Sequence, residues 1–161
     1  MSARADARQP ADDELLIVRT FDAPIALVFR VWEQREHMIR WWGPRDFTCT
    51  ALDVDFRPGG AWRACIVSDA YGETWMSGAF REIVRDRRIV FTFAWEGGDQ
   101  QPGVETLVTV TFEERDGKTT QTFHQAPFVS VETRDSHVSG WNECFDREQS
   151  YAEHLAPAGQ A

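Results

Sequence analysis

The 161-residue sequence has no apolar run that approaches the roughly 20 residues of a membrane-spanning helix. Its first residues, MSARADARQPADDE, also lack the apolar core of a signal peptide. Cysteine is scarce, and Cys49, Cys65 and Cys144 are far apart and show no metal-ligand spacing. These absences argue against insertion into a membrane and predict a cytoplasmic protein with reduced thiols.

Positive charge is also in short supply, with 17 Lys and Arg against 26 Asp and Glu and a formal net charge of −9. Nucleic acids and anionic membranes bind clustered Lys and Arg, so we expect neither as a partner. The four histidines form no metal-site pattern. The glycines match no phosphate-binding or dinucleotide-binding loop, and no serine lies in a nucleophile-elbow context. We therefore expect no metal and no cofactor, and the sequence shows no recognisable catalytic constellation.

Apolar and aromatic residues are abundant, at 42% and 12% of the chain, and seven of them are tryptophans. This composition is typical of a globular domain with a large interior or a lined cavity. Residues 1–13 lack periodicity and are predicted to be a disordered tail. We expect one domain over residues 14–155 and a short C-terminal tail over residues 156–161.

The middle of the chain alternates apolar and polar residues between turn signals, which predicts a run of strands. A first strand and two short helices precede it. The first helix starts at Asp22-Ala23-Pro24, with Asp22 or Ala23 at or beside the cap, and the second ends at Trp42-Gly43-Pro44. A glycine-rich loop is expected over residues 96–103. The predicted strands cover Leu15–Phe21, Phe47–Phe56, Ala61–Ser68, Glu73–Val84, Arg88–Trp95, Val104–Glu114 and Lys118–Ala126.

A long helix is predicted over Asp135–Leu155, because its apolar residues recur at helical spacing on one stripe. Glu148 interrupts that stripe, so its carboxylate points to the interior or, if the helix is slightly rotated, reaches solvent. A strand, two helices, about six further strands and a long helix predict an antiparallel α+β architecture. Such a sheet can leave a cavity between itself and the helix, which suits an apolar ligand.

Several motifs resemble START-like proteins of the heat-shock protein 90 ATPase activator type. They occur in the family's order along nearly the whole chain: Ala23-Pro24 with Val28-Phe29, Arg40-Trp41-Trp42-Gly43-Pro44, Arg57-Pro58-Gly59-Gly60, Gly72 with Gly78, Ile89-Val90-Phe91-Thr92 with Trp95, and Gly140-Trp141 with Phe145-Asp146-Arg147.

The resemblance implies a helix-grip fold, also called Bet v 1-like, in which six or seven curved antiparallel strands wrap a long C-terminal helix and leave a deep pocket. The family has no universal catalytic residue, so the fold cannot name an activity. Its eukaryotic activators carry a separate chaperone-binding domain before the fold. Nothing here corresponds to that domain, so the resemblance gives little support to a chaperone-stimulating role. Some relatives form dimers, but this sequence shows no interface.

Two departures from the family pattern suggest polar groups inside the cavity. Glu148 stands where the closing-helix motif usually has leucine, and Gln121 and Gln125 share the inward parity of Phe123 on the last strand. We expect these three polar residues to form one cluster. His137, one turn before Trp141, is the histidine that can reach the cavity mouth.

The favoured function is binding of a small, largely apolar molecule between sheet and helix. One alternative is a cyclase-like or hydrolase-like enzyme with Glu148 as acid or base. Another is a chaperone-related protein-interaction module. The predicted pocket residues are Trp62, Phe91, Phe93, Trp95, Val110, Gln121, Phe123, Gln125, Trp141, Phe145 and Glu148.

Overall fold

The alternating segments form one antiparallel sheet in the computed structural model, which describes residues 11–96 and 105–156. Its strand order is β1-β7-β6-β5-β4-β3-β2, so only β1 is displaced from chain order, and it pairs with β7. The strands are β1 (Leu15–Phe21), β2 (Thr48–Val54), β3 (Ala61–Ser68), β4 (Gly72–Val84), β5 (Arg88–Trp95), β6 (Thr106–Arg115) and β7 (Lys118–Ala126).

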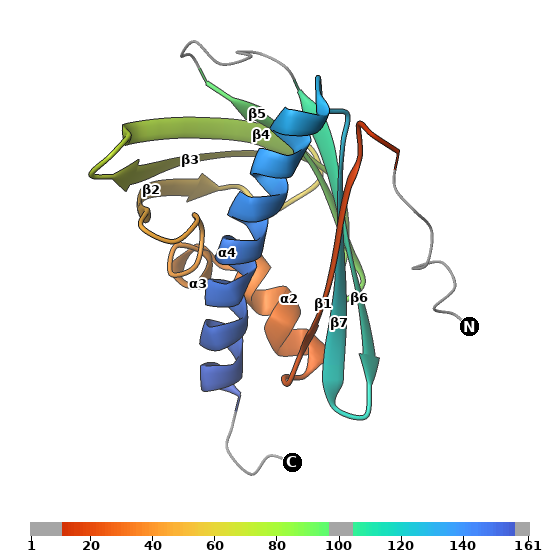
Figure 1. Cartoon of the computed structure of the whole chain (residues 1–161). Helices are drawn as coiled ribbons and strands as arrows, with labels where there is room; N and C mark the ends of the chain where they lie inside the picture. The colour runs from red at the N-terminus through yellow and green to blue at the C-terminus, as the bar shows by residue number, and fades with distance from the viewer. Residues whose placement is uncertain (1–10, 97–104, 157–161) are drawn as a thin grey trace.

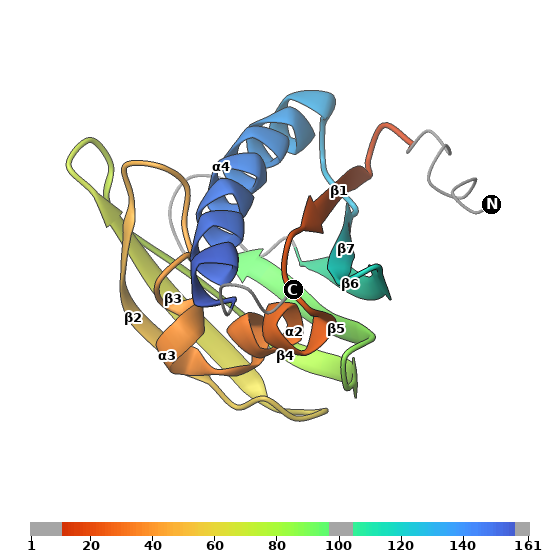
Figure 2. The same cartoon turned by 90° about the horizontal axis from the view of Figure 1, so that it is seen from below.

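The sheet curves around the long helix α4 (Val131–Leu155), which crosses its concave face (Figure 1). The short helices α2 (Ile25–Glu33) and α3 (Arg35–Met38) lie at one end of this curve (Figure 2). This arrangement confirms the predicted α+β helix-grip fold. Within the described residues, no helix is long and apolar enough to cross a membrane. The predicted tails and the loop over residues 96–103 lie largely outside the described residues.

The helix ends differ from the prediction where the chain uses a different cap. Helix α4 begins one turn earlier than Asp135, because the Ser130 side chain accepts a hydrogen bond from the Thr133 N–H at 3.0 Å. The N-cap of α2 is Pro24, without a side-chain cap, so Ala23 lies beside the cap and supplies no capping side chain. Helix α3 ends at Met38, before the Trp-Trp-Gly-Pro stop signal.

Replacing Ser130 by alanine is expected to lower the free energy of unfolding by about 1 kcal/mol, because the Thr133 N–H loses its acceptor. Chemical denaturation of the two proteins measures this change. Ser130→Asp supplies another capping oxygen and should retain most of the stability. Equal loss in both variants would show that the cap contributes little.

The core is built around Trp32, which α2 inserts between the sheet and α4. Its ring centroid lies 4.9 Å from that of Trp41 and 6.1 Å from that of Phe91. Phe123 and Phe145 flank the same ring at 6.5 Å and 6.4 Å. These side chains are at most 2% exposed, so the middle of the space between sheet and helix is filled.

Candidate functional site

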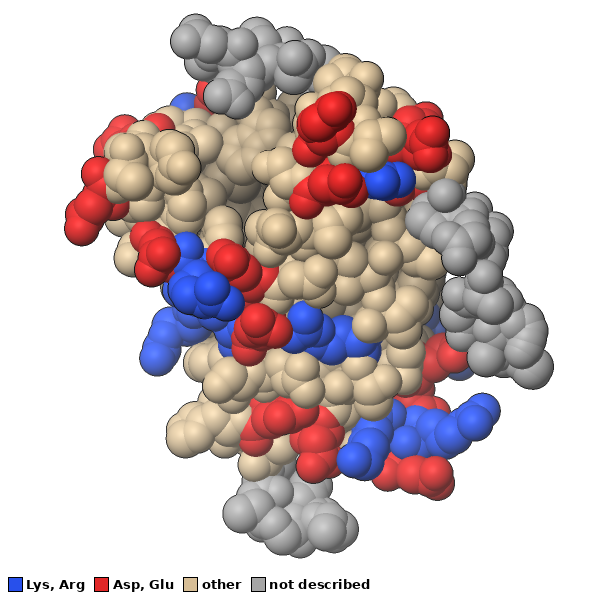
Figure 3. Space-filling view, viewed as in Figure 1, with Lys and Arg blue, Asp and Glu red and all other residues tan. Residues whose placement is uncertain are grey.

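A pocket of about 200 Å³ lies beside the N-terminal half of α4, where the filled interior ends. The space-filling view is hollowed there, between α4 and the ends of the strands (Figure 3). An engineered apolar cavity of about 150 Å³ holds benzene, so this volume suits a molecule of one or two rings. The lining residues are Trp42, Gly43, Pro44, Phe47, Ile66, Thr74, Met76, Phe93, Trp95, Ser136, His137, Gly140, Trp141 and Cys144.

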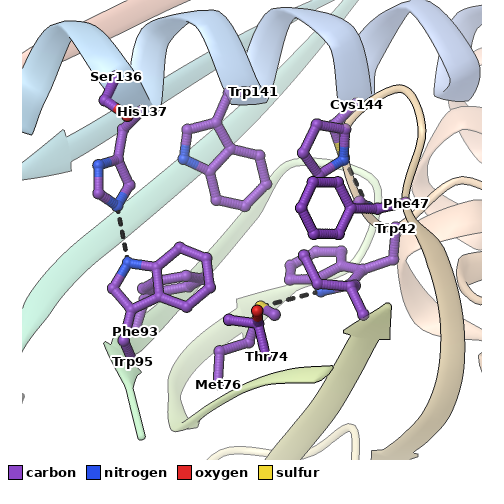
Figure 4. A pocket seen from close by; sticks show the side chains of 14 residues that line it. Trp42, Phe47, Thr74, Met76, Phe93, Trp95, Ser136, His137, Trp141 and Cys144 are labelled. Carbon is purple, nitrogen blue, oxygen red and sulfur yellow. Dashed lines mark hydrogen bonds between the residues drawn. The ribbon is translucent and has the colours of Figure 1, made fainter. Parts of the chain in front are cut away.

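Small residues on α4 leave the space that the pocket occupies. Ser136, Gly140 and Cys144 follow one another at a spacing of one helical turn and line the same wall. The opposite wall comes from β3, β4 and β5, whose inward side chains include Met76 and Phe93 (Figure 4). The segment before β2 closes one side. The pocket therefore exists because a stripe of small side chains faces the end of the curved sheet.

The deeper polar groups of the pocket are already paired. The Trp42 indole N–H donates to Sδ of Met76 at 3.4 Å. The Cys144 thiol donates to the Trp41 carbonyl at 3.3 Å and accepts from the Gly43 N–H at 3.4 Å. Burial raises the pKa of the Cys144 thiol far above its usual range, which removes it as a nucleophile.

Among the lining residues, His137 is the side chain whose titratable nitrogens form part of the cavity wall. Its Nδ1 lies 2.9 Å from the Thr133 carbonyl oxygen, and its Nε2 lies 2.9 Å from the Trp95 indole nitrogen (Figure 4). Burial lowers the pKa of the imidazole, which favours its neutral form. Phe93, Trp95 and His137 also line a second, smaller pocket of about 30 Å³, so they form the partition between the two.

Glu148 is fully buried in a polar cluster away from the pocket walls. The Trp32 indole N–H is shared between Oε1 of Gln121 at 2.9 Å and Oε2 of Glu148 at 3.0 Å. The Gln121 amide donates to Oε1 of Glu148 at 3.0 Å. Burial raises the pKa of the Glu148 carboxyl to about 8, although both hydrogen bonds and the charge of Arg19 oppose that rise.

Gln125 belongs to a different polar group, which corrects the expectation of a single cluster. Its Oε1 accepts from the Trp141 indole N–H at 2.8 Å, and its Nε2 donates to the Thr106 hydroxyl at 2.8 Å. Thr106 in turn donates to the Phe93 carbonyl at 3.0 Å. Each buried polar group therefore has its own partners, and the two clusters anchor different tryptophans.

The structure brings only part of the predicted site together. Phe93, Trp95 and Trp141 line the larger pocket, and Gln125 lines the smaller one. The remaining predicted pocket residues line neither, because Trp32 and its aromatic neighbours fill the space that they face. They are Trp62, Phe91, Val110, Gln121, Phe123, Phe145 and Glu148, each at most 4% exposed. The spacing of Ser136, Gly140 and Cys144 was the sequence signal that could have located the open end.

The fold and the pocket define a START-like protein of the helix-grip class, and comparison with known proteins agrees. The sequence profile of the family described as "Activator of Hsp90 ATPase homolog 1-like protein" matches residues 22–153. The chain therefore belongs to this family. A search of curated proteins finds no match.

Solved structures of bacterial proteins share the fold. A protein from Chromobacterium violaceum is 21% identical with a TM-score of 0.78, covering 88% of this chain and 98% of its own. The AHSA1 protein from Silicibacter pomeroyi is 22% identical with a TM-score of 0.76, covering 85% and 95%. A protein from Rhizobium leguminosarum is 25% identical with a TM-score of 0.74, covering 88% and 94%. These likenesses show that the fold is shared.

Proposed function

We propose that the protein binds a small, largely apolar molecule in the larger pocket. The observation that carries this proposal is a cavity of about 200 Å³ whose lining, among the described residues, includes several aromatic side chains and no Lys, Arg, Asp or Glu. Binding of a matching ligand to an apolar cavity of this size is favourable, because the ligand replaces poorly bound water. The buried, unpaired cysteines are in keeping with a cytoplasmic location.

The enzymatic alternative is less well supported by the position of Glu148. Its carboxyl is 0% exposed and is bonded to Trp32 and Gln121, and it does not line the pocket. A general acid or base must come within hydrogen-bond reach of its substrate. We therefore assign Glu148 a structural role and assign the pocket a binding role.

The test uses a larger side chain on α4 to fill the pocket. A Cβ at Gly140 would meet Pro44 only at 4.0 Å, so Gly140→Leu can place its side chain in the cavity without a backbone clash. We expect toluene to raise the thermal midpoint of the wild-type protein and to leave that of Gly140→Leu unchanged. Replacing a helical glycine also favours the helix by up to about 1 kcal/mol, so the variant should fold.

Ser139→Leu is the matched control, because Ser139 lies next in sequence on the exposed side of α4. It adds a side chain of the same size but leaves the cavity open, so toluene should still stabilise it. Loss of the toluene effect in both variants, or in neither, would contradict binding in this pocket. If toluene binds in this pocket, mass spectrometry of compounds released from the denatured wild-type protein would identify the natural ligand.

A further inference from the structure

The hydrogen bonds of His137 fix which ring nitrogen is open to a ligand. A carbonyl oxygen can only accept, so the contact with Thr133 requires the proton on Nδ1 of the neutral ring. Nε2 is therefore an acceptor, and the Trp95 indole N–H supplies its donor. Because this tautomer is held by the backbone of α4 itself, Nε2 stays an acceptor whether or not Trp95 is present.

The Trp95 indole N–H is the group of the protein itself that now donates to Nε2 of His137. It is the last residue of β5, and its backbone pairs with Met76 in β4, so the side chain can turn while the sheet stays intact. Its side chain is half-buried, whereas Trp42 and Trp141 are at most 7% exposed. Turning Trp95 away would expose Nε2 and enlarge the pocket towards the smaller one, since Trp95 and His137 line both.

We infer that the pocket takes a neutral aromatic molecule of one or two rings whose single O–H or N–H donates to Nε2 of His137 in place of the Trp95 indole. This inference rests on the proposed binding function and narrows its ligand class. The pocket volume sets the size, and the surrounding rings of Trp42, Phe93 and Trp141 favour a planar aromatic body.

The remaining chemistry of the pocket excludes other ligand classes. A carboxylate or ammonium group would lose its hydration without meeting an opposite charge among the lining residues that the structure describes. A ligand that only accepts hydrogen bonds would set its lone pair against the lone pair of Nε2. A ligand with a donor instead replaces one hydrogen bond by another, and it adds contacts that the pocket now lacks.

Isothermal titration with indole and benzofuran tests this inference, because the two molecules have nearly the same shape and differ in the N–H. In Trp95→Phe, where Nε2 of His137 has no internal donor, we expect indole to bind about five- to tenfold more tightly than benzofuran, the effect of one hydrogen bond. In the wild type indole must first displace the Trp95 N–H, so its preference over benzofuran should be smaller. Trp95→Phe removes the internal competitor and should tighten indole binding severalfold. Trp95→Phe also leaves some space, and any tightening of benzofuran binding from that space should be smaller than the tightening for indole.

His137→Phe supplies the converse test, since it keeps an aromatic ring and removes the acceptor. Indole and benzofuran should then bind equally, at about the wild-type affinity for benzofuran. Equal binding of the two compounds to both the wild type and Trp95→Phe would overturn the assigned ligand class while leaving the apolar pocket in place. Absence of binding by indole, benzofuran and toluene alike would overturn the proposed function as well.

Discussion

Replacing Glu148 by glutamine is expected to remove a large pH dependence of stability between about pH 4.5 and pH 8. In the folded protein, two oxygens converge on the Trp32 N–H, one from Gln121 and one from Glu148. They repel unless one of them carries a proton. A proton on Oε2 of Glu148 can be donated to Oε1 of Gln121. The Gln121 amide N–H already donates to Oε1 of Glu148, so the two bonds together form an acid–amide pair. Glutamine at position 148 can reproduce that neutral pair.

The sign of the effect follows from the raised pKa of a carboxyl group. Below its ordinary pKa of 4.5 the carboxyl is protonated in both the folded and the unfolded state, and its contribution to stability is fully present. As pH rises towards the folded pKa of about 8, the unfolded chain loses this proton and the folded protein keeps it. Unfolding then releases a proton, so the free energy of unfolding falls, by on the order of 5 kcal/mol over the whole window.

Urea denaturation of the wild type and Glu148→Gln at a series of pH values measures this difference. The wild type should lose stability relative to the variant from about pH 5 to about pH 8, and the difference should level off at higher pH. Glu132→Gln, a change at an exposed carboxylate on the same helix, is the control for altered net charge. A constant difference between wild type and Glu148→Gln across the range would show that the buried carboxyl is ionised in the folded state.

Replacing Gly78 by alanine is expected to destabilise the fold by about 3 kcal/mol or more. A Cβ at this position would lie 1.7 Å from the carbonyl oxygen of Thr92 and 2.7 Å from Nε1 of Trp62. The same carbonyl accepts the Trp62 indole N–H at 3.0 Å, so the clash cannot be relieved without moving a buried ring. Strands β4 and β5 would have to separate.

Gly72→Ala distinguishes this clash from an ordinary glycine effect. Gly72 has a φ of +70°, and no atom lies within 4 Å of an added Cβ, so only the backbone conformation opposes the change. We expect a loss of about 1 kcal/mol there. Thermal unfolding of both variants measures the contrast. Similar losses at the two positions would mean that the sheet can open beside Trp62 at little cost.

The fold was predictable from the sequence because each local signal agrees with the final architecture. Asp116-Gly117 predicted a hairpin, and both residues adopt positive φ angles between β6 and β7. Gly78 predicted a bulge or a close backbone approach in β4, and the approach to Thr92 is observed. The register shift in the same strand lies nearby, between Phe80 and Glu82. Such signals depend on neighbours in the chain or on one partner strand.

The position of the pocket was harder to predict because it depends on which side chains fill the interior. Strand parity correctly turns Phe91 and Phe123 inward, but parity does not say whether the facing space is empty. Trp32 enters that space from another element, which parity on β5 and β7 cannot reveal. Likewise Gln121 and Gln125 share one face, and their different partners on α2 and α4 place them in separate clusters.

The most direct test of the binding proposal follows the indole N–H signals of the seven tryptophans by NMR during titration with toluene. Trp42, Trp95 and Trp141 line the pocket, whereas Trp32 and Trp41 are buried elsewhere in the core. Single Trp→Phe variants assign the signals. The proposal predicts saturable shifts for the three pocket tryptophans and little change for the two core ones. Saturable shifts centred on Trp32 and Trp41, or no shifts at any tryptophan, would contradict it.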